Sequence, residues 1–118
     1  MPSDSVRLDV RRDANTSLVA IAGRVDASAD EPLRSAVDEA LTGPPERLIL
    51  DFTAMEYMNS TGIALVVGVL GRARAAGVPV AACGLSPHYQ EIFRITRLSD
   101  FLPLFDDEAG ARAGLAVA

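Results

Sequence analysis

Two segments near the N-terminus, residues 6–12 and 17–25, show the apolar and polar pattern of β-strands. In the second segment Leu18, Val19 and Ile21 follow one another with little polar interruption, which predicts a strand buried on both faces. The residues between the segments, Asp13-Ala14-Asn15-Thr16, are typical of a turn. The two strands are therefore expected to form a hairpin.

Apolar residues then recur at three- and four-residue spacing, which predicts a helix over about residues 29–41. Ser28 and Glu31 have the spacing of a capping box, and Pro32 falls in the first turn, where a missing N–H costs little. Gly43-Pro44-Pro45 ends the helix. Its expected buried face is Leu33, Ala36, Val37, Ala40 and Leu41.

Strands and helices alternate in the rest of the chain. We expect strands over residues 47–52, 78–82 and 101–105, a loop over residues 53–59, and a helix over residues 60–76 that ends at Gly77. Ser86-Pro87 begins a third helix, which directs Tyr89, Ile92, Phe93 and Thr96 inward, and residues 106–108 begin a fourth.

The order β-β-α-β-α-β-α-β-α predicts an α/β fold over residues 1–118 as a single domain. Its central mixed sheet would have four to five strands, the first two antiparallel and the rest mostly parallel, flanked by four helices. The core should contain apolar residues from every segment: Val19, Ile21, Leu33, Val37, Leu48, Leu50, Ile63, Val67, Leu70, Val80, Ile92 and Phe93.

Composition narrows the function classes. Of 118 residues 49% are hydrophobic, and the net charge is -5 with every basic residue an arginine, so the chain lacks the basic clusters of a nucleic-acid binder. No apolar run approaches the length that spans a bilayer, and the N-terminus lacks the pattern of a signal peptide. We therefore expect a cytoplasmic protein with no membrane insertion.

Enzymatic motifs are missing from the sequence. It has no lysine, hence no phosphate-binding Gly-Lys loop, and it has neither a Gly-x-Ser-x-Gly nor a Gly-x-Gly-x-x-Gly motif. A single cysteine and a single histidine exclude an intramolecular disulfide and a Cys- or His-rich metal site. Cys83 is expected as a buried apolar residue rather than a reactive thiol, and His88 as a helix residue rather than a catalytic base. We expect no enzyme activity and no cofactor.

The start of the second helix, Asn59-Ser60-Thr61-Gly62, is the most informative segment. Asn and Ser are good N-caps, and the free N–H groups of a first helical turn also bind anions. Ser60 can therefore be a cap, or it can accept a phosphate that adds about -1.5 to -2 charge to this surface.

Residues around this helix start are unusual. Gly62 costs about 1 kcal/mol against alanine inside a helix, which suggests a close approach of backbone or of a partner. Met55, Tyr57 and Met58 are apolar where a loop is normally polar. They are either interaction residues or core residues beneath the loop.

The segment that begins at Asp51 resembles the central motif of the STAS family, the domain of bacterial anti-sigma factor antagonists. The matching residues are Asp51 and Tyr57-Met58-Asn59-Ser60-Thr61-Gly62-Ile63. The family pattern is a strand that ends in Asp, an apolar loop, and Asp-Ser-Ser/Thr-Gly-Leu/Ile at a helix start. Two flanking motifs of the family are matched as well. The first is Gly23-Arg24-Val25-Asp26, and the second is Gly77-Val78-Pro79-Val80 followed by Gly84-Leu85-Ser86-Pro87. The resemblance covers essentially the whole chain.

The resemblance implies a partner switch. The unmodified protein would bind an anti-sigma factor that is also a serine kinase; phosphorylation at Ser60 would release it, and a phosphatase would restore binding. Thr61 would help to cap the helix, and Asn59 takes the place of the family's acidic residue, which is a departure from the pattern. The expected partner surface is Asp26, Ala27, Ser28, Tyr57, Met58, Asn59, Ser60, Thr61 and Gly62.

An alternative remains within the same fold. The chain would then be a scaffold of the stressosome type, or the regulatory subunit of a transporter, without a role toward a sigma factor. A nearby gene for a kinase-type anti-sigma factor would favour the anti-sigma factor antagonist, and nearby transporter genes would favour the regulatory subunit of a transporter.

Overall fold

A computed structural model describes residues 5–13 and 15–116 of the chain. The N-terminal hairpin is present: β1 (Arg7–Arg12) pairs antiparallel with β2 (Thr16–Val25), with Val10 opposite Val19. The Asp13 N–H donates to the Thr16 carbonyl at 3.1 Å and closes the predicted turn, of which Ala14 lies outside the described residues.

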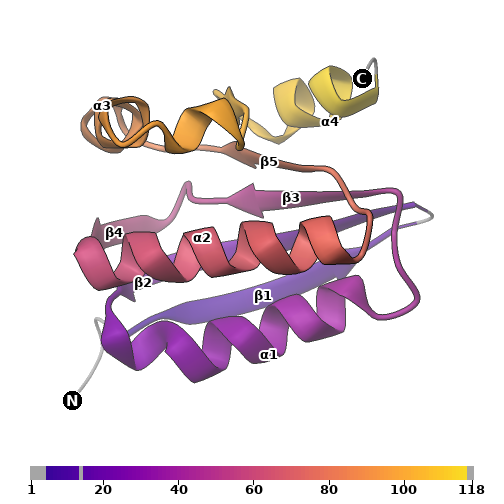
Figure 1. The fold of residues 1–118 in the computed structure, drawn as a ribbon, viewed down its shortest axis with the longest axis horizontal. Coiled ribbons are helices and arrows are strands. Elements are labelled where there is room, and N and C mark those ends of the chain that lie inside the picture. The colour runs from indigo at the N-terminus through magenta and orange to yellow at the C-terminus, as the bar shows by residue number, and fades with distance from the viewer. Residues whose placement is uncertain (1–4, 14, 117–118) are drawn as a thin grey trace.

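The remaining strands are parallel to β2 and extend the sheet in the order β1-β2-β3-β5-β6 (Figure 1). They are β3 (Arg47–Asp51), β5 (Val80–Cys83) and the two-residue β6 (Leu104–Phe105). The predicted mixed sheet is thereby confirmed. The predicted loop over residues 53–59 is wrong, because its apolar part forms β4 (Met55–Met58), which pairs with the end of β2.

Helices cover the two faces of this sheet unequally. The 3₁₀ turn η1 (Ala27–Ala29), α1 (Asp30–Leu41), α2 (Ser60–Ala75), α3 (Pro87–Ile95) and η2 (Leu98–Asp100) contribute to one apolar cluster, and α4 (Glu108–Ala116) contributes to another. Adjacent residues of β3 are divided between the clusters, Leu48 and Leu50 in the first and Ile49 in the second. Since neighbours on a strand face opposite sides, α4 covers the opposite face from α1 and α2. In Figure 1 α1 and α2 run side by side.

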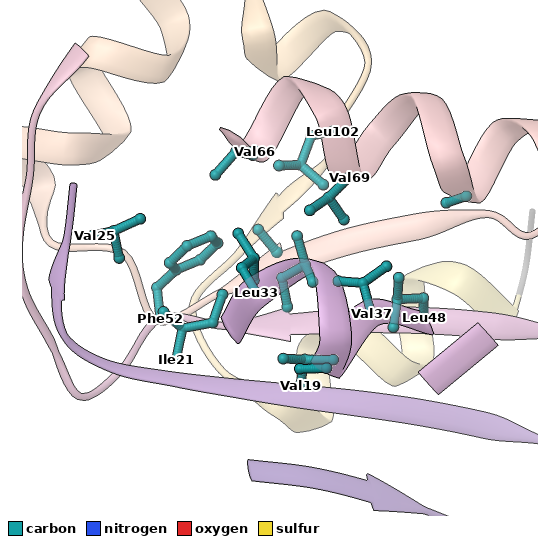
Figure 2. Close-up of a cluster of buried hydrophobic side chains, with 14 of the residues drawn as sticks. Val19, Ile21, Val25, Leu33, Val37, Leu48, Phe52, Val66, Val69 and Leu102 are labelled. Carbon is teal, nitrogen blue, oxygen red and sulfur yellow. The ribbon is translucent and has the colours of Figure 1, made fainter. Parts of the chain in front are cut away.

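The larger cluster is the main core (Figure 2). Leu33 and Val37 of α1 meet Val66 and Val69 of α2 over the strands, and all four side chains are buried. Beneath them lie fully buried residues from the sheet and the segment after β3: Val19, Ile21, Leu48, Leu50 and Phe52. Phe52 packs edge-on against Phe93 of α3, with ring centres 6.1 Å apart, which attaches α3 to the same core.

The structure corrects several expected side-chain positions. Val67 is 51% exposed, so its expected place in the core is wrong. It follows buried Val66 by one residue, which turns it about 100° around the helix axis and away from the sheet. Thr96 ends α3 with an exposed side chain that donates to the Ile92 carbonyl. The other expected core residues are buried or half-buried.

The capping box expected at Ser28 and Glu31 is also wrong. The chain makes the 3₁₀ turn η1 before α1, so the α-helix begins after Ala29, which makes no side-chain cap. Asp26 caps the 3₁₀ turn instead, because its Oδ1 accepts from the Ser28 N–H at 3.0 Å. A cap two residues earlier than expected brings this carboxylate to the end of β2.

None of the helices within residues 5–13 and 15–116 has the length and apolar character needed to cross a bilayer.

Candidate functional site

Two segments distant in sequence meet where β2 and β4 end. The strands are parallel, with Val25 opposite Met58, so the residues that follow them emerge at one edge of the sheet. The Asn59 N–H donates to the Val25 carbonyl at 3.3 Å, which ties the start of α2 to the end of β2. We call this edge, from Asp26 to Ser28 and from Tyr57 to Gly62, the switch edge.

Gly62 explains how the helix comes so close to the strand. A Cβ built at this position would collide with the Val25 carbonyl oxygen and would lie 2.8 Å from the Met58 Cγ. Only glycine therefore lets the first turn of α2 rest on the backbone of β2. The close approach expected at Gly62 is made by the protein's own backbone.

Asn59, rather than Ser60 or Thr61, caps α2. Its Oδ1 accepts from the Gly62 N–H at 2.9 Å, and its backbone carbonyl accepts from Ile63 at 3.0 Å. The first-turn N–H groups of Ser60 and Thr61 have no acceptor within the helix. Both side chains are exposed, so the Ser60 hydroxyl is accessible and is not needed for the cap.

Arg24 joins the two halves of the switch edge. It lies opposite Tyr57 in the β2–β4 ladder, and its guanidinium carbon is 4.2 Å from the centre of that ring. Its Nε is also 3.9 Å from the Asp26 Oδ2. Hydrogen bonds from the Ser28 hydroxyl and N–H hold the pKa of the Asp26 carboxyl below its usual value, so Asp26 is ionised at neutral pH.

Tyr89 supports the switch edge from α3. The Met58 N–H donates to the Tyr89 hydroxyl oxygen at 2.9 Å, which satisfies a backbone donor of β4. The sequence pattern placed Tyr89 on the inner face of its helix, and a tyrosine there usually carries a hydroxyl that needs a partner. That partner, and the place of Arg24, were missed because both depend on the unpredicted strand β4.

The predicted site residues all lie at the switch edge and differ in their burial. Met58 and Gly62 are buried and hold the edge in place, so Met58 is a core residue. Asp26 and Asn59 are half-buried and act as caps. The exposed residues available to a partner are Ala27, Ser28, Tyr57, Ser60 and Thr61.

Two further side chains, His88 and Cys83, were considered in the sequence for their reactivity. His88 is exposed in the first turn of α3 and packs edge-on against the Tyr89 ring. Burial, together with the nearby Asp51 carboxylate, raises the pKa of the Cys83 thiol to about 12, which makes it a poor nucleophile. No cluster of three or more His, Cys, Asp or Glu side chains suited to a metal ion occurs among residues 5–13 and 15–116.

The fold thus combines a mixed sheet in the order β1-β2-β3-β5-β6 with a helix, α2, whose start is tied to β2 and whose first residue is the exposed Ser60. The family model described as the STAS domain matches residues 7–111. The chain belongs to the STAS domain family.

Similar sequences and solved structures support this family membership. The anti-sigma-B factor antagonist of Bacillus subtilis is 30% identical over 101 residues, which cover 85% of this chain and 91% of that protein. Among solved structures, an anti-sigma factor antagonist from Mycobacterium paratuberculosis matches with a TM-score of 0.84 at 19% identity, covering 97% of both chains. The phosphorylated form of the Bacillus cell fate determinant SpoIIAA matches with a TM-score of 0.67 at 22% identity, covering 97% of this chain and 100% of the other. At these identities the two structures establish the fold.

Proposed function

We propose that this chain is an anti-sigma factor antagonist that binds an anti-sigma factor with serine kinase activity, and that phosphorylation of Ser60 releases the partner. The observation that carries the proposal is the Ser60 hydroxyl, exposed at the first residue of α2 and free of any capping duty. The anti-sigma-B factor antagonist of Bacillus subtilis supports the partner class, and the phosphorylated form of SpoIIAA supports the modification.

The unmodified switch edge suits a protein partner. It presents the Tyr57 ring, 37% exposed and braced by Arg24, beside the small side chains of Ala27 and Ser28. A braced aromatic ring loses little side-chain freedom when a partner covers it, which favours a contact residue.

Phosphorylation would change this surface without disturbing the fold. The phosphate would lie at the positive end of α2, near the first-turn N–H groups of Ser60 and Thr61. An interface packed over Ser60 would then have to desolvate about -1.5 to -2 charges, which costs several kcal/mol unless a cation faces them. Binding is therefore lost while α2 remains folded.

Asn59 makes this phosphate easier to place. The residue keeps the capping hydrogen bond to Gly62, which a neutral amide oxygen serves as well as a carboxylate. A neutral side chain beside Ser60 spares the phosphate a like-charge contact. A partner that reads an acid at this position would bind less tightly, which makes Asn59 a determinant of partner choice.

We further propose that the chain acts in the cytoplasm as a single domain over residues 1–118, and that a phosphatase resets Ser60. The proposal requires no catalysis by the chain itself, because the kinase and the phosphatase supply the chemistry.

The test compares partner binding by four proteins: unmodified, phosphorylated at Ser60, Ser60→Asp and Ser60→Ala. Isothermal titration with a cognate kinase-type anti-sigma factor should show at least a hundredfold loss, about 2.7 kcal/mol, for the phosphoprotein. Ser60→Asp should weaken binding in the same direction. Ser60→Ala should bind, and it should take up no phosphate when ATP is added.

Ser35→Asp is the matched control, since it adds the same charge at an exposed position of α1 that faces β1. It should bind like the unmodified protein, and all variants should keep the wild-type circular dichroism spectrum. Equal affinity of the phosphorylated and unmodified proteins would refute the switch and leave the scaffold and transporter-subunit alternatives.

A further inference from the structure

A second surface of the molecule has an apolar groove. It lies between the second half of α2 and the segment from the end of α3 through η2, and the residues before β5 close it below. Its volume is about 490 Å³. The lining residues used below are Val67, Leu70, Gly71, Arg74, Arg97 and Phe101.

This groove lies apart from the switch edge. Arg74 is 14 residues after Ser60 on the same helix, which at 1.5 Å per residue places it about 21 Å along the axis. None of the switch-edge residues lines the groove.

Exposed apolar side chains gather around the groove. Among the described residues, the large hydrophobic side chains classed as exposed are Tyr57, Val67, Ile95 and Phe101. Val67 and Phe101 line the groove with 51% and 67% of their surface exposed, and Ile95 immediately precedes its lining residue Thr96. Apolar side chains concentrated on one surface mark a binding site more often than isolated ones do.

The charge of the lining is opposite to that of the molecule. The chain carries 16 acidic and 11 basic residues, yet the groove is lined by two arginines and by no acid. Arg74 is exposed and has no ion-pair partner among the described residues. Arg97, with φ of 66°, is held by Asp100 through its Nε at 2.8 Å and is 79% exposed. The rim therefore offers an acidic occupant the unpaired guanidinium group of Arg74 and the terminal nitrogens of Arg97, whose Nε is held by Asp100.

Gly71 keeps the floor of the groove open. A glycine inside a helix costs about 1 kcal/mol against alanine, and the space around Gly71 would accept a Cβ, with no atom within 4 Å. Packing within the protein therefore does not require glycine there, in contrast to Gly62. An occupant that approaches the helix backbone closely would require it.

We propose that this groove is a second docking site, which binds an apolar protein segment flanked by carboxylates. Apolar side chains of that segment would lie over Gly71 between Val67 and Phe101, and its acids would pair with Arg74 and Arg97. This site shares no residue with the switch edge.

Charge and exposure favour this occupant over two others. A second copy bound about a two-fold axis would bring the same patch, with an unpaired Arg74 and no acid among its lining residues, against itself, so it offers the arginines less charge complementarity than an acidic segment does. Small-molecule sites bury most of their ligand, whereas this groove is lined by side chains as exposed as Val67 and Phe101. A protein segment is large enough to cover both side chains.

The test uses designed peptides of about 12 residues that place leucine and phenylalanine on one helical face. One peptide carries glutamate beside that face, and two others carry glutamine or lysine at the same positions. Fluorescence anisotropy gives affinity, and amide shifts of the full chain give the location. The glutamate peptide should bind at Val67, Leu70 and Phe101 and exceed the lysine peptide by at least about tenfold.

Two glycine variants distinguish a groove that is blocked from a protein that is destabilised. Gly71→Leu should fill the groove and reduce binding of the glutamate peptide at least about tenfold, without loss of stability. Gly68→Leu adds the same side chain one turn away, at a position that faces α1, and should bind like the wild type. Arg74→Gln should bring the affinities for the glutamate and glutamine peptides closer together.

Ser60→Asp should leave peptide binding at the groove unchanged. The peptide experiment therefore tests the groove independently of the proposed phosphorylation of Ser60. The proposal is overturned if the glutamate peptide causes no amide shifts at the groove at about 1 mM, or if the lysine peptide binds equally well. It is also overturned if Gly71→Leu binds like Gly68→Leu. A concentration-dependent dimer in sedimentation that Gly71→Leu abolishes would assign the groove to a second copy.

Discussion

Glycines within α2 have opposite environments at the level of the single residue. Gly62 lies against the β2 backbone with no room for a Cβ, whereas Gly68 and Gly71 have no atom within 4 Å of the position a Cβ would take. The same residue type is therefore required by packing at the first position and costs helix stability at the other two.

Gly62→Ala should lower the free energy of unfolding by about 1–3 kcal/mol, because the added methyl group must displace the helix or the strand. Gly68→Ala is the control and should raise it by up to about 1 kcal/mol through helix propensity alone. Urea unfolding measures both values. Equal effects of the two variants would show that α2 does not rest on β2 as described.

Cys83 gives a pH prediction. Burial raises its pKa in the folded protein to about 12, above the ordinary thiol value of 9.0, so the folded state retains the thiol proton. The free energy of unfolding should be insensitive to this group below pH 9 and should fall as the pH rises from 9 toward 12. Cys83→Ala should remove this part of the pH dependence.

The same property should appear in labelling. At about pH 8 an aromatic disulfide reagent should modify Cys83 slowly in the folded protein and rapidly after denaturation. Rapid modification of the folded protein would contradict the buried, protonated thiol.

Short elements were the hardest to predict from sequence. Long periodic segments, such as the apolar face of α1, gave the correct helix, and the Gly77 stop after α2 was also correct. β4 was missed because four residues hold too little pattern, and only pairing with β2 makes them a strand. The α1 cap was misplaced because a 3₁₀ turn before a helix shifts the cap without changing the apolar spacing.

Tyr89→Phe tests what holds β4. It removes the hydroxyl that accepts from the Met58 N–H and should cost about 1–3 kcal/mol, toward the lower end because the group is partly accessible. Amide exchange at Met58 should become faster. Tyr57→Phe changes the exposed tyrosine of the same edge and should alter stability by less than about 0.5 kcal/mol. No difference between these variants would contradict the Tyr89 support.

At the scale of the whole molecule, the sheet divides two unequal cores. The alternation along β3 sends Leu48 and Leu50 under α1, α2 and α3, while Ile49 faces α4. Sequence pattern predicted the α/β class, the mixed sheet and the position of the switch edge, since loops that follow parallel strands share one edge. It could not predict that Val67 faces outward, because nearly every residue from Ile63 to Leu70 is apolar and gives no preferred face.

Leu50→Ala should lower the free energy of unfolding by about 2–5 kcal/mol, because Leu50 is fully buried in the larger core. Val67→Ala removes apolar atoms from an exposed position of α2 and should change it by less than about 0.5 kcal/mol. Chemical denaturation of both variants provides the comparison. A large effect of Val67→Ala would place that side chain in the core after all.

The length of β2 has a consequence for the time course of folding. The hairpin that β2 forms with β1 closes across a short turn. The pairing of Val25, at the end of β2, with Met58 must close a loop of about 30 residues. Contacts close in sequence form sooner than distant ones, so the hairpin should acquire protection before the switch edge in pulse-labelling experiments. The start of α2 would then reach its place against the end of β2 late in folding, after the hairpin is already protected.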